Sequence, residues 1–262
     1  MRKRTPSLPC SFECCASRRG TWNVERPRAR TVARRERLLE AMTAIDADVW
    51  VLTETHDTLR PGRDFQGCST TDPDRDSEPG ERWVTIWSRL PIEALPSMSD
   101  ASRSVAARVV ARGIGPVVVI GTVLPWLGSA WRGIGSANGE AFRAALTLQL
   151  SNWLALREAH QDAALVLAGD LNQDLSPTHY YGSRGNRAAL ESALAAAGIR
   201  CLTAGDSDPV RRYAAGHASI DHICVGAGLE PLSPPTSWPR APRPQASLSD
   251  HFGVMVELEA SP

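Results

Sequence analysis

The sequence has no hydrophobic run long enough to cross a membrane. The best candidate among its 262 residues is the stretch 115–127, which Gly121 and two prolines interrupt, whereas a transmembrane helix needs roughly 20 consecutive apolar residues. The basic N-terminus is not followed by an apolar segment of signal-peptide length. We therefore expect a chain without a membrane span, and we expect it in the cytoplasm.

Cysteine is sparse, and its spacing excludes the common cysteine-based sites. No two of the six cysteines form a CxxC pair, so we do not expect a structural zinc site. Their scatter is not typical of a disulfide framework either, which agrees with a reducing compartment. These residues are Cys10, Cys14, Cys15, Cys68, Cys201 and Cys224.

Lysine is almost absent, and the net charge is zero. Lys3 is the single lysine among 29 basic residues, which 29 acidic residues balance. Eleven of the basic residues and three glutamates lie within residues 1–37, so this segment carries +8 and the remainder −8. We expect the basic start to be a solvated tail followed by the outer face of a helix, with contact to nucleic acid or a membrane surface as the alternative. The neutral total gives no support to an extensive basic face.

The rest of the composition is that of an ordinary globular protein, with 42% hydrophobic and 22% charged residues. Strand-like and helix-like patterns mix along the whole length, without repeats or a linker, which favours one α/β domain over residues 18–262. Residues 1–17 show little periodicity and are predicted to be a disordered extension. The predicted strands are 18–24, 48–53, 82–88, 105–112, 116–124, 164–168, 219–225 and 253–258, the helices 28–45, 138–158 and 186–197, and the long loops 57–81 and 231–247.

Polar residues stand at the edges of several of these apolar strands. Asn23, Glu54 and Asp170 each end one. Taken singly, each has an ordinary explanation, such as a turn or an ion pair. Similar residues at other strand edges make convergence on one rim the better interpretation, because strand ends in layered α/β folds commonly build the site. These further residues are Asp221, Asp250 and His251.

The residue types fit phosphate-ester hydrolysis with a hard metal ion. Mg²⁺ prefers oxygen ligands and takes one or two protein carboxylates, which Glu54 and Asp250 would supply, with the Asn23 oxygen nearby. Mn²⁺ is a possible substitute. A metal ion on the phosphate stabilises the charge of the transition state.

The other polar residues would then act on water and phosphate. Asp170 is free to orient and deprotonate the attacking water, while Asn172 can hold Asp170 or the phosphate through its amide. His251 can hydrogen-bond a phosphate oxygen or transfer a proton. Asp221 can fix the His251 ring from its other nitrogen.

Five segments in order resemble the endonuclease/exonuclease/phosphatase superfamily. They are Thr21-Trp22-Asn23-Val24-Glu25, Leu52-Thr53-Glu54-Thr55, Gly169-Asp170-Leu171-Asn172, Ser219-Ile220-Asp221-His222-Ile223 and Ser249-Asp250-His251-Phe252. The resemblance implies a four-layer α/β/β/α sandwich with two mixed β-sheets packed face to face and helices outside.

The resemblance also implies roles for the matching positions. It places Asn23, Glu54 and Asp250 at the metal and phosphate end, and Glu25 where some relatives have an acidic residue. The positions at the water-activating and phosphate-binding end are Asp170, Asn172, Asp221 and His251. One departure is Val123, which stands where many relatives carry a phosphate-contacting histidine.

The sequence therefore predicts a Mg²⁺-dependent phosphoesterase that hydrolyses a phosphodiester or phosphomonoester by in-line attack of water. Its substrate is either nucleic acid or a small phosphoester, and no stable protein partner is implied. Loops at the rim would choose the substrate; the candidates are 57–81, 126–135, 176–187 and 231–247. The alternative is a binding module that keeps the fold without catalysis.

Overall fold

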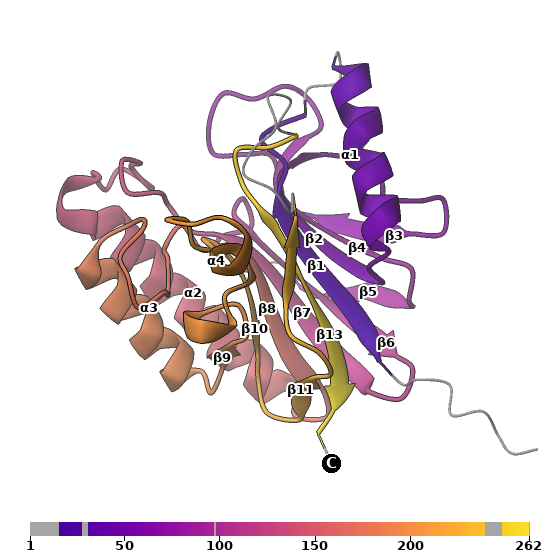
Figure 1. Ribbon diagram of the computed structural model, residues 1–262. Coiled ribbons are helices and arrows are strands. Elements are labelled where there is room, and N and C mark those ends of the chain that lie inside the picture. Colours follow the sequence, from indigo (N-terminus) through magenta and orange to yellow (C-terminus); the bar gives the residue numbers. More distant parts are fainter. Residues whose placement is uncertain (1–15, 28–30, 97, 239–247, 262) are drawn as a thin grey trace, which may run out of the picture.

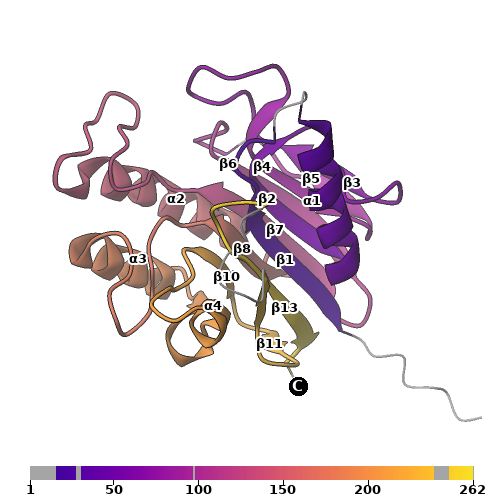
Figure 2. The same cartoon turned by 45° about the horizontal axis from the view of Figure 1, so that its top comes forward.

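Two mixed β-sheets lie face to face with helices on their outer surfaces (Figures 1 and 2). The computed structural model describes residues 16–27, 31–96, 98–238 and 248–261. One sheet has seven strands and the other six. This arrangement confirms the predicted α/β/β/α sandwich.

The first sheet contains the N-terminal and C-terminal strands side by side. Its order is β11-β13-β1-β2-β4-β3, with β12 also paired to β13, and β1 runs parallel to β2 while its other pairs are antiparallel. The strands are β1 (Ser17–Asn23), β2 (Val49–His56), β3 (Gln66–Ser69), β4 (Glu81–Ser88), β11 (Leu229–Pro231), β12 (Thr236–Trp238) and β13 (Gly253–Ala260).

The second sheet is built from the middle of the chain. Its order is β5-β6-β7-β8-β10-β9, and only β7 and β8 are parallel. The strands are β5 (Ile92–Ala94), β6 (Ser104–Ala111), β7 (Gly115–Val123), β8 (Ala164–Asp170), β9 (Arg200–Cys201) and β10 (Asp221–Val225).

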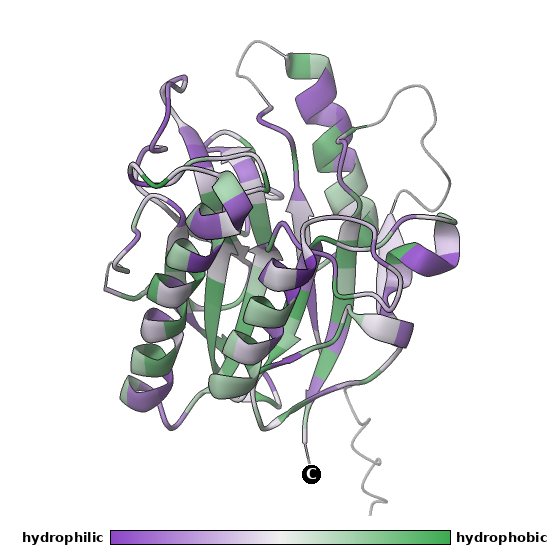
Figure 3. Ribbon diagram, turned by 90° about the vertical axis from the view of Figure 1, so that its left-hand side faces the viewer, coloured by the Kyte–Doolittle hydropathy of each residue, from purple (hydrophilic) through white to green (hydrophobic). Residues whose placement is uncertain are grey.

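The outer helices each bury one apolar side. The α1 helix packs on the first sheet through Leu38 and Met42, whereas α2 packs on the second through Phe142, Leu146 and Trp153. Figure 3 shows mostly hydrophobic strands and helices that alternate between hydrophobic and hydrophilic residues. The helices are α1 (Val32–Ile45), α2 (Glu140–Ala159), α3 (Arg184–Ala196), α4 (Pro209–Tyr213) and the 3₁₀ turns Ala137–Gly139 and Gly205–Ser207. None of the helices in the described parts of the chain could span a membrane.

The facing surfaces of the sheets form a core of small branched side chains. Val51, Val84, Val119 and Val166 are all buried there. The sheets approach so closely at Gly121 that a Cβ on this residue would lie 2.6 Å from Val84 Cγ1 and 3.0 Å from Val51 Cγ1. A glycine is therefore required where the layers touch.

The structure corrects several predicted boundaries. The predicted loop 57–81 contains the edge strand β3, and β12 lies inside the predicted loop 231–247. The short elements β5, β9 and α4 were not predicted either. Strand β2 continues through Glu54 instead of ending before it. Parts of the predictions for 1–17, 28–45 and 231–247 lie outside the described residues.

Candidate active site

The strand ends meet at one edge of the space between the sheets. Asp170 is the last residue of β8 and Asp221 the first of β10, and the two are direct partners in the antiparallel register. Asn23 ends β1, which lies in the opposite sheet. Both sheets therefore contribute polar side chains to the same buried place.

Asn23 connects carboxylates from the two sheets. Its Nδ2 donates hydrogen bonds to Glu54 Oε1 at 3.2 Å and to Asp170 Oδ2 at 3.1 Å. Its Oδ1 accepts the backbone N–H of Glu25 at 2.9 Å. Because the side chain is only 1% exposed, this amide fixes how Glu54 and Asp170 lie relative to one another.

Glu54 has a second partner on the solvent side. The Arg26 Nε lies 2.7 Å from Glu54 Oε2, and this hydrogen bond raises the pKa of Arg26. Glu54 itself has a backbone φ of +45°, an uncommon conformation for a residue with a side chain. Such strained residues are often found at functional sites. Nothing in the sequence pattern singled out Arg26.

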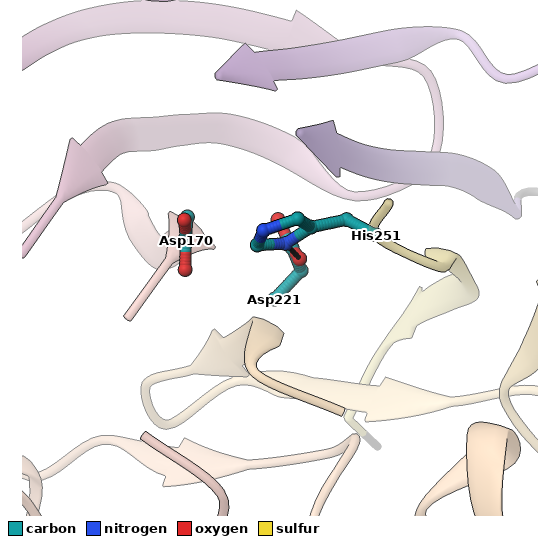
Figure 4. Close-up of side chains that lie close together, drawn as sticks. All are labelled: Asp170, Asp221 and His251. Atoms are coloured by element: carbon teal, nitrogen blue, oxygen red, sulfur yellow. Dashed lines mark hydrogen bonds and ion pairs between the residues drawn. The ribbon is translucent and has the colours of Figure 1, made fainter. Parts of the chain in front are cut away.

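His251 is held by a short ion pair with Asp221. The distance from Nδ1 to Asp221 Oδ2 is 2.6 Å, and Figure 4 shows both side chains beside Asp170. Burial acts to lower the pKa of His251, but the charges of Asp221 and Asp170 prevail and raise it to about 10. The other ring nitrogen, Nε2, lies 4.0 Å from Asp250 Oδ1, beyond hydrogen-bond distance. His251 is thus held as a cation.

Asp170 is a buried carboxyl group with an unusual proton affinity. Desolvation by burial and the negative charges of Asp221 and Glu54 raise its pKa to about 7, although the charge of His251 opposes this. A pKa near neutrality suits a group that accepts a proton at physiological pH.

The loops after β7 and β8 are tied together around Asp170. The backbone N–H of Asn172 donates to Asp170 Oδ1 at 2.9 Å, while the Asn172 Nδ2 donates to the carbonyl of Leu124 at 2.9 Å. The Leu124 N–H in turn donates to the carbonyl of Asp170 at 3.0 Å. Asn172 therefore holds Asp170 through its backbone, and its side-chain amide bonds a neighbouring loop.

The structure thus brings the predicted residues to one edge of the sandwich, with different environments. One potential ligand atom from each of Asp170, Asp221 and His251 lies within 4.8 Å of the others. Asn23 is hydrogen-bonded to Asp170 and joins Glu54 to it, whereas the Asp250 side chain is 54% exposed at the rim. Asp221 Oδ1 is buried without a hydrogen-bond partner. A hard divalent cation fits the carboxylate oxygens at this edge, whereas the protonated His251 ring offers it no ligand atom.

Two further residues complete the surroundings. Val123 is buried at the end of β7, opposite Asp170 in the parallel register, so an apolar side chain stands where the sequence resemblance led us to expect a histidine. Burial raises the pKa of the Tyr181 hydroxyl, and the negative charge of the nearby Asp170 raises it further. From the sequence, Tyr181 is only one residue of the predicted loop 176–187.

Comparison with known proteins agrees with this geometry. A family model described as Endonuclease/Exonuclease/phosphatase family matches residues 20–251. The chain belongs to the endonuclease/exonuclease/phosphatase family. No curated protein sequence matches it significantly.

Several solved structures share the fold of this endonuclease/exonuclease/phosphatase family member. An endonuclease/exonuclease/phosphatase from Beutenbergia cavernae is 20% identical, with a TM-score of 0.62 over 94% of this chain and 72% of that one. An AP endonuclease from Leishmania major is 13% identical, with a TM-score of 0.65 over 94% and 88%. The human Nocturnin catalytic domain with bound sulfate is 17% identical, with a TM-score of 0.62 over 94% and 95%. These similarities establish the fold.

Proposed function

We propose that the protein is a metal-dependent phosphoesterase in which Asp170 activates the attacking water. The observation that carries this proposal is the geometry of Asp170, a buried carboxyl group at a strand end that Asn23 and the Asn172 backbone hold in place beside His251 and Asp221; burial and the neighbouring carboxylates raise its pKa to about 7 in the metal-free protein. Such a group accepts a proton from water near neutral pH. Family membership supports the reaction class, because the family includes nucleases and phosphatases.

The metal site proposed here is Glu54 and Asp250. Asn23, expected from the sequence beside the metal, is assigned instead to positioning Glu54, because its Nδ2 donates to that carboxylate and its Oδ1 accepts the Glu25 N–H. The cluster of negative charge that raises the pKa of Asp170 favours a cation, and the oxygen donors favour Mg²⁺, or Mn²⁺, over softer metals. When bound, the ion polarises the phosphate and stabilises the leaving oxygen.

The remaining residues act on the proton and the phosphate oxygens. Asp170 accepts a proton from the water as it attacks phosphorus in line. His251, kept protonated by Asp221, donates a hydrogen bond from Nε2 to a non-bridging oxygen. Asp221 is a positioning residue, since it acts through the imidazole ring. Asn172 fixes the Asp170 carboxylate through its backbone N–H and binds the loop after β7 through its side-chain amide.

The substrate is proposed only as a phosphate ester. Nucleic acid and small phosphoesters both fit the chemistry, and the loop segments 57–65, 70–80, 126–135 and 176–183 would choose between them. The ratio of diester to monoester hydrolysis separates nuclease-like from phosphatase-like activity.

The test is hydrolysis of bis-p-nitrophenyl phosphate and p-nitrophenyl phosphate with Mg²⁺, Mn²⁺ or EDTA. Asp170→Asn keeps the size and shape of the side chain but cannot accept the proton of water, and it should lower the rate by roughly 10²–10⁴-fold. Asp208→Asn is the matched control, because Asp208 is an equally buried carboxylate whose partners are Ser219 and the Val210 backbone. Its rate per folded molecule should stay unchanged. Metal binding without turnover of either ester would instead identify a binding module.

A further inference from the structure

Two cysteines lie directly opposite each other at the far edge of the second sheet. Cys201 of the edge strand β9 and Cys224 of β10 are register partners in an antiparallel pair. The Leu202 N–H donates to the Ile223 carbonyl at 2.9 Å, so the next pair, Cys201 and Cys224, is a non-hydrogen-bonded one. Such pairs have Cα atoms about 4.5 Å apart, inside the range of about 4.4–6.8 Å that a disulfide spans.

The side chains of this pair point to the same face of the sheet. Both thiols are free, and both pack in the core between the second sheet and its outer helices. Each thiol also shifts the pKa of the other, that of Cys201 downward and that of Cys224 upward. A bond between them therefore requires no change in strand pairing.

The surroundings of Cys201 favour its thiolate. Its Sγ lies 3.4 Å from His222 Nδ1 and 3.6 Å from Thr203 Oγ1. Burial acts to raise the pKa of Cys201, yet the Cys224 thiol and the charge of His222 hold it well below the usual range. Since the thiolate is the reactive form of cysteine, this sulfur is the better nucleophile of the two.

Access to the two thiols is unequal. Cys224 is completely buried in a central strand, while Cys201 is only partly buried in the edge strand. A small oxidant reaches Cys201 first, and Cys224 is the thiol already beside it. This is the arrangement of an attacking cysteine and a resolving cysteine.

We propose that Cys201 and Cys224 form a peroxide-reactive dithiol on the side of β10 away from the phosphoesterase site. The Cys201 thiolate attacks one oxygen of hydrogen peroxide, the O–O bond breaks, and after protonation water leaves, with Cys201 as a sulfenic acid. The Cys224 sulfur then attacks the Cys201 sulfur, the S–O bond breaks, and a second water leaves with the thiol proton. The two cysteines lose two electrons and two protons, and one peroxide becomes two waters.

The disulfide would act on the strand that carries Asp221. It would tie the edge strand to β10 at a point three residues beyond Asp221 and close the chain segment 201–224, which contains α4. It would also remove the thiol contact to His222. The inference is independent of the proposed phosphoesterase chemistry.

The experiment uses the full-length protein, treated with hydrogen peroxide in the native state and mapped by mass spectrometry of non-reduced peptides. Among Cys68, Cys201 and Cys224, the cysteines in the described part of the chain, we expect one linked peptide pair, joining Cys201 to Cys224, with the loss of two hydrogens and full recovery after dithiothreitol. Cys68 is the internal control, because burial raises its pKa to about 11, and it should stay reduced. Linkage of Cys68 to Cys201 or Cys224, or no linkage of Cys201 to Cys224, would overturn the proposal.

Two variants separate the attacking and resolving roles. In Cys224→Ser, dimedone should trap a sulfenic acid on Cys201, because no resolving thiol remains. In Cys201→Ser, Cys224 should give neither disulfide nor dimedone adduct. A dimedone adduct on Cys224 in that variant would contradict the assignment. If a variant does not fold, the wild type unfolded in urea replaces it as a control. In urea, peroxide should no longer link Cys201 to Cys224 selectively. Selective linkage in the unfolded protein would show that the fold does not create this reactivity.

Discussion

The two faces of strand β10 carry histidine clusters of opposite character. On the inner face, Asp221 holds Nδ1 of His251 at 2.6 Å. On the outer face, the adjacent residue His222 is completely buried, and both of its ring nitrogens are occupied. Its Nδ1 lies 3.0 Å from Thr203 Oγ1 and its Nε2 3.0 Å from the Gln173 carbonyl.

The two imidazoles have similar proton affinities but different freedom. The pKa of His251 is raised to about 10, and that of His222, against burial, to about 9 by Cys201 and the Gln173 carbonyl. Of the two histidines, only His251 has a ring nitrogen, Nε2, whose nearest charged neighbour, Asp250, lies beyond hydrogen-bond distance. A shifted pKa therefore does not identify a catalytic group by itself. The histidine whose second ring nitrogen can reach a substrate is the candidate for catalysis, and the histidine with both nitrogens bonded inside the fold has a structural role.

The largest expected effect tests that distinction directly. His251→Gln should lower phosphoester hydrolysis by roughly 10²–10³-fold, because a glutamine amide that bonds Asp221 is neutral and does not replace the charged Nε2–H donor on the opposite side of the ring. His222→Gln should leave the rate per folded molecule unchanged. Steady-state kinetics on p-nitrophenyl esters, with folded protein quantified by circular dichroism, checks both. Equal losses in the two variants would mean that the faces do not differ in function.

The inner face could be predicted from sequence, because its signal is local. An apolar run that ends in Asn23 or Asp170 is visible along the chain. In a two-sheet sandwich such strand ends lie at one of two edges, so polar residues at several strand ends come close together. The outer cluster could not be predicted in this way. Cys201 belongs to a strand of two residues, and its position opposite Cys224 depends on strand register across a long intervening segment.

The same reasoning explains the other misses. Strand β3 is a short edge strand of a polar region, so little burial marks it in the sequence. The Arg26–Glu54 pair joins residues distant in the chain, and Asn172 carries its expected role through its backbone instead of its side chain. Local patterns predict which residues are polar at a strand end, whereas the partner of each depends on tertiary packing.

A second prediction concerns the effect of the buried Asp170 carboxyl group on the stability of the folded protein. The folded-state pKa of Asp170, about 7, lies above its ordinary value of 3.8. This group therefore favours the folded state fully below pH 3.8, and that contribution is lost as pH rises through 7. Each unit of difference in pKa corresponds to about 1.4 kcal/mol, so the contribution of Asp170 is on the order of a few kcal/mol. In EDTA, Asp170→Asn should be the more stable protein at pH 8.

Urea unfolding between pH 4 and 8 measures this effect. The wild-type free energy of unfolding should fall relative to that of Asp170→Asn across this range, with most of the change between pH 4 and 7. Asp208→Asn, the buried carboxylate with local hydrogen-bond donors, is the control and should not gain stability at high pH. Parallel pH curves for wild type and Asp170→Asn would remove the basis for a general base at this position.

A third prediction sharpens the structural role of the outer face. His222→Leu fills the space but leaves the Gln173 carbonyl without its donor and Thr203 without its ring partner. Because unsatisfied buried polar groups each cost about 1–3 kcal/mol, we expect a loss of about 3 kcal/mol in the free energy of unfolding. Gln161→Leu, at an exposed glutamine, should change it by less than about 0.5 kcal/mol. Equal effects would mean that the His222 hydrogen bonds do not stabilise the fold.

The smallest expected effect separates the parts of the outer cluster. The Thr203 hydroxyl accepts the Ile223 N–H at 3.1 Å as well as bonding His222, so Thr203→Val should cost about 1 kcal/mol, while Thr203→Ser should be close to wild type. Without this hydroxyl, Cys201 Sγ is the nearest remaining partner of His222 Nδ1. Oxidation of Cys201 by peroxide should then become faster in Thr203→Val, because the imidazolium no longer divides its hydrogen bond between oxygen and sulfur. A slower reaction would mean that Thr203 itself supports the thiolate, and that the histidine has only a structural role on this face.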